Sequence, residues 1–111
     1  MEEEKKIIRR APAIPMLISE LNAKVGRVAI VGTIVSRNQE IGSIVIDDGT
    51  GSVLVLLNNP ADTSKYTEGQ IVLVHGKIWG SENEIEIQGE LIRDFSKIDL
   101  ELYKKIFFNR E

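Results

Sequence analysis

The sequence lacks several residue types on which common enzyme chemistries depend. It contains no cysteine, which excludes a disulfide framework and a thiolate metal site. Its single histidine, His75, lies in an apolar stretch and is more typical of a packed or rim residue than of a catalytic base. No phosphate-binding glycine loop occurs, and the adjacent Asp47 and Asp48 suit turn capping better than a metal site. We therefore expect a protein that is not an enzyme, with no cofactor and no metal.

The sequence also lacks a basic excess and a long apolar run. Fourteen Lys and Arg against 17 Asp and Glu give a net charge of −3, which argues against a DNA-binding protein driven by charge alone. A nucleic-acid role would need a local patch, stacking or help from other subunits. No run approaches the roughly 18 apolar residues of a membrane span, and the first residues lack the apolar core of a signal peptide. We expect an intracellular protein without a membrane partner.

The apolar residues are present in a pattern that predicts strands. Hydrophobic residues make up 42% of the chain, which is enough for one core. A short helical turn is expected over residues 18–25 and another between the third and fourth strands. Gly32 and Gly76 interrupt two strands internally, as glycines at barrel corners do. The five predicted strands cover residues 27–37, 43–47, 52–57, 70–79 and 84–92.

This order of elements predicts an all-β fold, a five-stranded OB-fold Greek-key barrel with a C-terminal α-helix. An SH3-like barrel is the alternative. We expect a flexible N-terminal arm over residues 1–15, because Pro12 and Pro15 oppose a helix there. The barrel then covers residues 16–95. Residues 96–111 form an oligomerisation helix, with Ser96 as its predicted N-cap.

Six residues are candidates for binding nucleic acid. Trp79 ends the fourth strand beside the groove of an OB-fold, where a base can stack on an indole. Cations and a polar side chain near the same groove are expected to contact phosphates, and a second aromatic is a weaker stacking candidate. The alternative is a core or interface tryptophan with a solvated rim. The candidates are Trp79, Lys77, Arg37, Asn38, Arg27 and Tyr66.

The outer faces of the second and third strands are predicted to be apolar. If Ile44 and Ile46 point inward, Val45 points outward; on the next strand, Leu54 and Leu56 do the same. Such a surface needs cover by bases or by protein. The fifth strand alternates, with Ile85, Ile87, Gly89 and Leu91 on one side and an acidic row, Glu84, Glu86 and Glu90, on the other. We expect nucleic acid to avoid the acidic row.

The last helix carries an apolar arc wider than one docking surface needs. At about 100° per residue, its apolar side chains span roughly 200°, about twice the stripe that packs a helix on its own core. We expect part of this arc to contact another subunit; the alternative is a helix that caps the barrel deeply. The predicted interface residues are Ile98, Leu100, Leu102, Tyr103, Ile106 and Phe107.

These features together resemble the small and middle OB-fold subunits of replication protein A, the heterotrimeric single-stranded-DNA-binding complex of eukaryotes and many archaea. The resemblance covers roughly residues 9–108, and its order of runs is more specific than any one motif. Its runs are residues 9–13 (RRAPA) in the arm, 28–35 (VAIVGTIV) in the first strand, 44–51 (IVIDDGTG) in the hairpin and 69–79 (GQIVLVHGKIW) in the fourth strand.

The resemblance implies a role in DNA replication, repair and recombination. It implies that single-stranded DNA and the other subunits are partners, and that the C-terminal helix joins a three-helix bundle with those subunits. An aromatic residue near the loop between strands four and five contacts DNA in such subunits, and Trp79 matches its place. The aromatic residue that closes their third strand has no counterpart in residues 54–59. It also implies the cytoplasm or nucleoid of an archaeon, or a eukaryotic nucleus. An RNA- or tRNA-binding OB protein and a purely structural assembly module remain alternatives.

Overall fold

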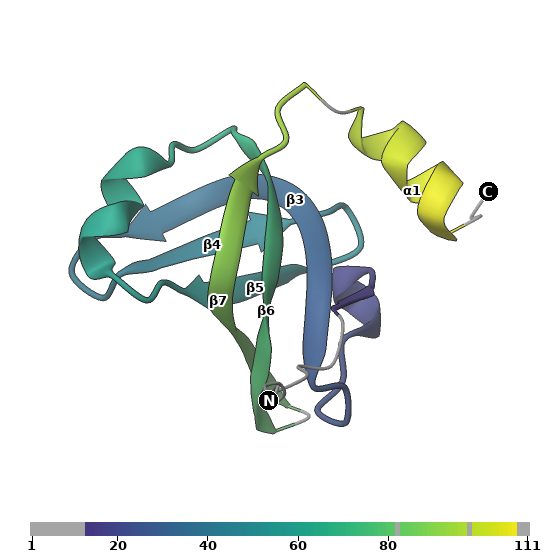
Figure 1. Cartoon of the computed structure of the whole chain (residues 1–111), viewed down its shortest axis with the longest axis horizontal. Helices are drawn as coiled ribbons and strands as arrows, with labels where there is room; N and C mark the ends of the chain where they lie inside the picture. The colour runs from purple at the N-terminus through teal and green to yellow at the C-terminus, as the bar shows by residue number, and fades with distance from the viewer. Residues whose placement is uncertain (1–12, 82, 98, 109–111) are drawn as a thin grey trace, which may run out of the picture.

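Runs rich in Ile and Val, separated by glycine- and asparagine-containing turns, form the five strands of the barrel (Figure 1). The computed structural model describes residues 13–81, 83–97 and 99–108. All five predicted strands are present, and their ends differ from the predicted ones by no more than two residues. They are β3 (Arg27–Asn38), β4 (Ser43–Asp47), β5 (Ser52–Leu56), β6 (Ile71–Ser81) and β7 (Glu84–Asp94).

The sheet closes because β3 pairs with two other strands. Its first half runs antiparallel to β6, from Arg27 opposite Lys77 to Thr33 opposite Ile71. Its second half runs antiparallel to β4 and ends with Asn38 opposite Ser43. β4 continues to β5, β5 joins β7 in parallel, and β7 returns to β6. This closed, mixed barrel confirms the predicted OB-fold.

Gly32 lies where β3 passes from β6 to β4, as its interior position predicted. A Cβ atom built on Gly32 would lie 2.9 Å from the carbonyl oxygen of Asp47. Glycine therefore lets two strand backbones approach at the corner of the barrel.

The core consists of inward side chains that are almost completely removed from water. Burying one Ile or Val side chain contributes about 1.5–3 kcal/mol, so these residues supply the main stabilising term. The residues with at most 1% of their surface exposed include Val28, Ile30, Ile34, Ile44, Ile46, Val55, Val72, Val74 and Ile87.

Two short elements precede the barrel. The strand β2 (Ile14–Pro15) pairs in parallel with Val28 and Ala29, so regular structure begins inside the range predicted as an arm; residues 1–12 lie outside the described residues. The 3-10 helix η1 (Ile18–Glu20) is shorter than the turn predicted over residues 18–25. It ends early because Leu21 adopts an extended conformation, with φ −61° and ψ 140°.

The connector between β5 and β6 forms the 3-10 helix η2 (Pro60–Lys65), close to the predicted turn. The side chain of Asn59 caps it by accepting a hydrogen bond from the backbone N–H of Ala61 at 3.1 Å.

The C-terminal helix α1 (Leu100–Phe108) begins later than predicted. The cap is Asp99, whose Oδ1 accepts the N–H of Leu102 at 3.1 Å. Ser96 does not cap the helix, because the helix begins four residues after it; its hydroxyl donates to Asp94 Oδ1 at 2.6 Å. No helix within the described ranges is long and apolar enough to cross a membrane.

The predicted alternation along β7 is wrong at Leu91. A bulge separates the pair Gly76–Gly89 from the pair His75–Leu91, which leaves Glu90 as an extra residue. After Gly89, the residues predicted to point inward therefore point outward, and those predicted to point outward point inward. Ile92 packs against the core, while Leu91 is 42% exposed.

We predict that Gly32→Ala lowers the free energy of unfolding by about 1–3 kcal/mol, because the added methyl group meets the backbone of Asp47. Gly26→Ala is the matched control, since a Cβ atom there meets nothing within 4 Å. Urea denaturation followed by circular dichroism measures both. Equal stability of the two variants would contradict the close approach at the corner.

Candidate nucleic-acid interface

Ten side chains form two rows across the outside of the barrel, defined by the pairing register of the strands; one of them, Ser43, is buried. The first row crosses β6, β7, β5, β4 and β3 through Trp79, Glu86, Leu54, Val45 and Ser36. The second row crosses the same strands through Lys77, Gln88, Leu56, Ser43 and Asn38. We call these ten residues the outer face.

The centre of the outer face is apolar, as predicted. Ile44, Ile46 and Val55 point inward and are fully buried, so Val45, Leu54 and Leu56 must point outward. These three remain half-buried on the surface of the barrel. A half-buried apolar strip with polar residues at both ends is a surface on which a flat, partly apolar ligand can lie.

Trp79 and Lys77 lie on one face of β6, as predicted. The indole of Trp79 is 55% exposed, so it does not belong to the core. Lys77 is exposed and forms no hydrogen bond or ion pair with any residue that the structure describes. The pair therefore offers a stacking surface and an uncompensated positive charge on adjacent rows.

Glu86, a member of the acidic row that nucleic acid is expected to avoid, lies on this same face. The register sets Glu86 directly opposite Trp79 on one side and Leu54 on the other. Side chains opposite one another in a sheet have Cβ atoms about 4.5–5.5 Å apart. A stacked base on Trp79 would therefore meet a carboxylate.

Arg27 lies opposite Lys77, but its charge is already paired. Its Nε and one terminal nitrogen donate to the two carboxylate oxygens of Glu90, each at 3.0 Å. Hydrogen bonding to Glu90 is the main cause that raises the pKa of Arg27 above its ordinary value. Of the two paired residues Arg27 and Lys77, Lys77 is therefore the one available to a phosphate.

Three other predicted site residues form structural contacts. Arg37 donates to the carbonyl oxygens of Thr63 at 3.0 Å and Tyr66 at 2.7 Å, which fastens the end of η2 to β3. Asn38 Oδ1 accepts the N–H groups of Glu40 and Ile41 and so shapes the loop after β3. The Tyr66 ring packs against the core. Arg37 and Asn38 are still exposed, whereas Tyr66 is half-buried.

Two residues near the outer face were missed by the sequence analysis. Ile41, in the loop after β3, is 59% exposed, and no periodicity marks it. Gln88, which alternates with the predicted neighbours Ile87 and Gly89, was not assigned to the site; its Nε2 donates to Asn58 Oδ1 at 2.9 Å. The alternation along residues 84–92 was the available signal for Gln88.

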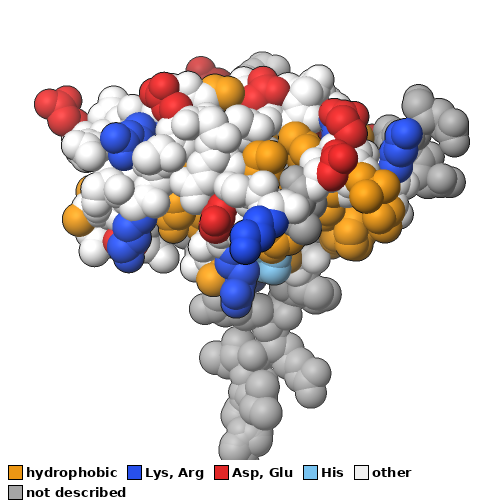
Figure 2. Space-filling view, turned by 90° about the horizontal axis from the view of Figure 1, so that it is seen from above, with side chains coloured by type: hydrophobic (Ala, Val, Ile, Leu, Met, Phe, Trp, Pro, Cys, Tyr) orange, Lys and Arg blue, Asp and Glu red, His pale blue; other side chains and the backbone are white. Residues whose placement is uncertain are grey.

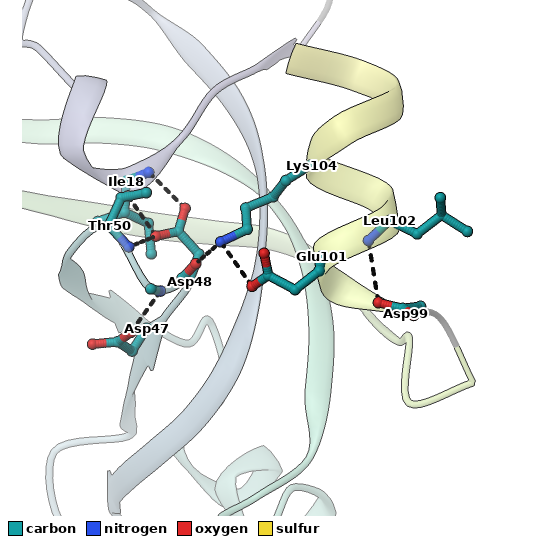
Figure 3. Close-up of polar contacts among 9 residues, drawn as sticks. Ile18, Asp47, Asp48, Thr50, Asp99, Glu101, Leu102 and Lys104 are labelled. Atoms are coloured by element: carbon teal, nitrogen blue, oxygen red, sulfur yellow. Dashed lines mark hydrogen bonds and ion pairs between the residues drawn. The ribbon is translucent and has the colours of Figure 1, made fainter. Parts of the chain in front are cut away.

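Asp48 joins three parts of the chain at the turn between β4 and β5 (Figure 3). Its carboxylate accepts the N–H of Ile18 at 2.9 Å and both the N–H and hydroxyl of Thr50, at 2.9 and 2.6 Å. Its carbonyl oxygen accepts a hydrogen bond from Lys104 Nζ at 2.8 Å, so the turn also holds α1. Asp47 accepts the N–H of Gly49. Both aspartates cap the turn, as predicted.

The apolar side chains of α1 gather on the surface beside the barrel (Figure 2). Leu102 is 53%, Ile106 65% and Phe107 60% exposed, and they line an open groove together with Tyr103. Tyr103 lies between the rings of Phe95 and Phe107, and its burial raises the pKa of its hydroxyl above the ordinary value. We call Leu102, Tyr103, Ile106 and Phe107 the helix stripe.

The barrel does not cover the helix stripe. None of the residues of α1 is fully buried, and Lys104, which contacts the turn between β4 and β5, lies on the other side of the helix. Leu100 is half-buried, and the predicted interface residue Ile98 lies outside the described residues. This arrangement differs from a helix that caps the barrel deeply.

The comparisons with known proteins give likeness of structure. No protein-family model matches the sequence. No curated protein matches it either. The telomere capping protein Ten1 from Saccharomyces pombe is 20% identical with a TM-score of 0.68, over 89% of this chain and 97% of that one. Replication protein A of U. maydis bound to single-stranded DNA is 23% identical with a TM-score of 0.63, over 91% of each chain.

An isolated OB-fold domain shows the same likeness of structure. The second OB-fold domain of replication protein A from Methanococcus maripaludis is 23% identical with a TM-score of 0.59, over 78% of this chain and 99% of that one. At these identities the likeness establishes the OB-fold of the barrel. The function of the outer face and of the helix stripe has to be argued from their own chemistry.

We predict that Asp48→Ala lowers the free energy of unfolding by about 2–4 kcal/mol, because three hydrogen bonds to a buried carboxylate are lost. Asp47→Ala is the control; its carboxylate accepts the N–H of Gly49 within the turn, and we expect a loss of about 1 kcal/mol or less. Thermal and urea denaturation measure the difference. An equal loss of the free energy of unfolding in both variants would show that the contacts of Asp48 with Ile18 and Thr50 do not stabilise the fold as described.

Proposed function

We propose that this chain is a non-catalytic subunit of a replication-protein-A-like complex that binds single-stranded DNA in replication, repair and recombination. The observation that carries the proposal is the outer face: an exposed tryptophan and an uncompensated lysine beside a half-buried apolar strip on an OB barrel. In this proposal bases stack on Trp79, a phosphate binds Lys77, and the DNA strand crosses β7, β5 and β4.

The charge of the chain supports binding as part of a complex. With a net charge of −3 and Arg27 paired to Glu90, the barrel has little charge with which to attract phosphates. Stacking alone contributes about 1–3 kcal/mol per base, which gives weak binding for one subunit. Linking several such subunits raises the overall affinity, because the later contacts become intramolecular.

The uncovered helix stripe supports assembly. Leu102, Ile106 and Phe107 expose large apolar side chains on one helix, and such patches mark protein contacts. We infer that the stripe packs against helices of sister subunits in a bundle. This assignment puts the protein in the compartment that holds the DNA of the cell. The likeness to a replication protein A chain bound to single-stranded DNA agrees with the proposal at the level of fold.

We predict that Trp79→Ala weakens binding of single-stranded DNA by the complex by about 5- to 150-fold, which is the loss of one stacked base. Trp79→Phe should retain most of the affinity, because a phenyl ring still stacks. Fluorescence anisotropy with a labelled oligonucleotide measures both. Unchanged affinity of the alanine variant would remove Trp79 from the site.

The two alternatives make different predictions for the same complex. An RNA-binding OB protein should prefer single-stranded RNA in a competition assay, since the 2′-hydroxyl is the group that distinguishes the two. A purely structural module should give no DNA adduct on this subunit when the assembled complex is photocrosslinked to DNA.

For the helix, we predict that changing both Tyr103 and Phe107 to Asp releases the subunit from its partners while the barrel stays folded. Two charges cannot be buried in an apolar helix contact without a large penalty. Co-purification measures the release, and circular dichroism measures the fold.

The matched control for that variant is Glu101→Ala with Lys105→Ala, which changes two exposed residues of the same helix outside the stripe. The control should still co-purify with the partners. If the doubly charged variant unfolds, the helix stripe serves the fold of the barrel instead.

A further inference from the structure

The position of Glu86 is unexpected for a surface that binds a polyanion. It lies in the first row of the outer face, between Trp79 and Leu54. A carboxylate there repels phosphates and weakens binding of any DNA sequence. Glu84 lies opposite Ser81 in the next row, beside the turn between β6 and β7, and is therefore not opposite Trp79.

The carboxylate of Glu86 is half-buried and has no partner within the described ranges. It forms no hydrogen bond or ion pair with any residue that the structure describes there. Lys77 is its diagonal neighbour across β6 and β7, a position about 7–8 Å away in a sheet. Both oxygens of Glu86 are therefore available to a group that lies against Trp79.

The edge of a base offers such a group. Guanine presents two adjacent donors on its Watson–Crick edge, N1–H and the N2 amino group, and a carboxylate presents two acceptors. Adenine, cytosine and thymine each place a ring nitrogen or carbonyl acceptor next to their donor, which the carboxylate repels.

We propose that Glu86 selects guanine for the base that stacks on Trp79. This inference rests on the proposed function, because it needs a base on Trp79, but it adds a specific preference at one position. A bidentate contact to the correct base discriminates by about 1–3 kcal/mol, which corresponds to about 5- to 150-fold in affinity. The cost of a negative charge on the outer face is then offset by the contact to one base.

Four labelled oligonucleotides of about 15 nucleotides test this with the full chain: oligo(dT) and repeats of d(TTG), d(TTA) and d(TTC). Isolated guanines avoid four-stranded structures. Anisotropy gives the affinities. Trp79 is the single tryptophan of the chain, so quenching of its fluorescence reports a base stacked at that position.

We expect d(TTG) to bind about tenfold more tightly than the other three oligonucleotides. Glu86→Gln should abolish this preference while binding to oligo(dT) stays the same or becomes tighter. Glu84→Gln removes the same charge from the same side of β7 one row away and should keep the preference.

Two results would overturn the inference without touching the proposed function: equal binding of all four sequences with quenching of Trp79, or a Glu86→Gln variant that binds all four more tightly by the same factor. The second result would mean that Glu86 acts through charge alone. If no oligonucleotide quenches Trp79 or binds, either to the chain or to the co-purified complex, the proposed function itself fails.

Discussion

The pairing of β3 with both β6 and β4 determines where every outward side chain of the barrel lies. Once β3 is shared, the Ile and Val residues of five strands turn into one enclosed core, and alternation sends the intervening residues to the surface. Trp79 and Glu86, from one hairpin, then share a row with Leu54, which lies about 25 residues earlier in the sequence. A shift of one strand's register by a single residue would exchange its two faces, and these three side chains would no longer lie next to one another. The pairing register of the strands therefore brings the residues of the candidate site together.

The outer face brings together an exposed aromatic group, an aliphatic centre and charges of both signs. Its aromatic group lies at one edge, its centre is aliphatic, and its uncompensated lysine adjoins a carboxylate. Arg27, which could have added a second positive charge, is bound to Glu90 at the bulge of β7. A surface of this composition favours contacts with the faces and edges of bases over contacts with the phosphate backbone. Affinity then depends on how many such surfaces act together.

The sequence predicted the strands, the closure and the inward and outward sides of β4 and β5, because alternating Ile and Val residues report burial directly. It did not predict the exchange of Leu91 and Ile92, since a bulge depends on the opposite strand. It predicted Ser96 as the cap of α1. In the structure Asp99 caps the helix, and the hydroxyl of Ser96 bonds to Asp94. Arg37 and Asn38 were found as polar residues near the groove, but their contacts to η2 and the loop come from tertiary structure.

The hydrogen bond from Lys104 to the carbonyl of Asp48 connects α1 to the turn between β4 and β5, in addition to the covalent link through residues 95–99. A hydrogen bond from a charged group contributes about 1.5–3 kcal/mol. The undocked helix is then a minor population, of the order of 0.1–10% of molecules. Because this contact joins a side chain to a turn carbonyl and involves no pairing between strands, α1 can leave the turn while every strand of the barrel keeps its register.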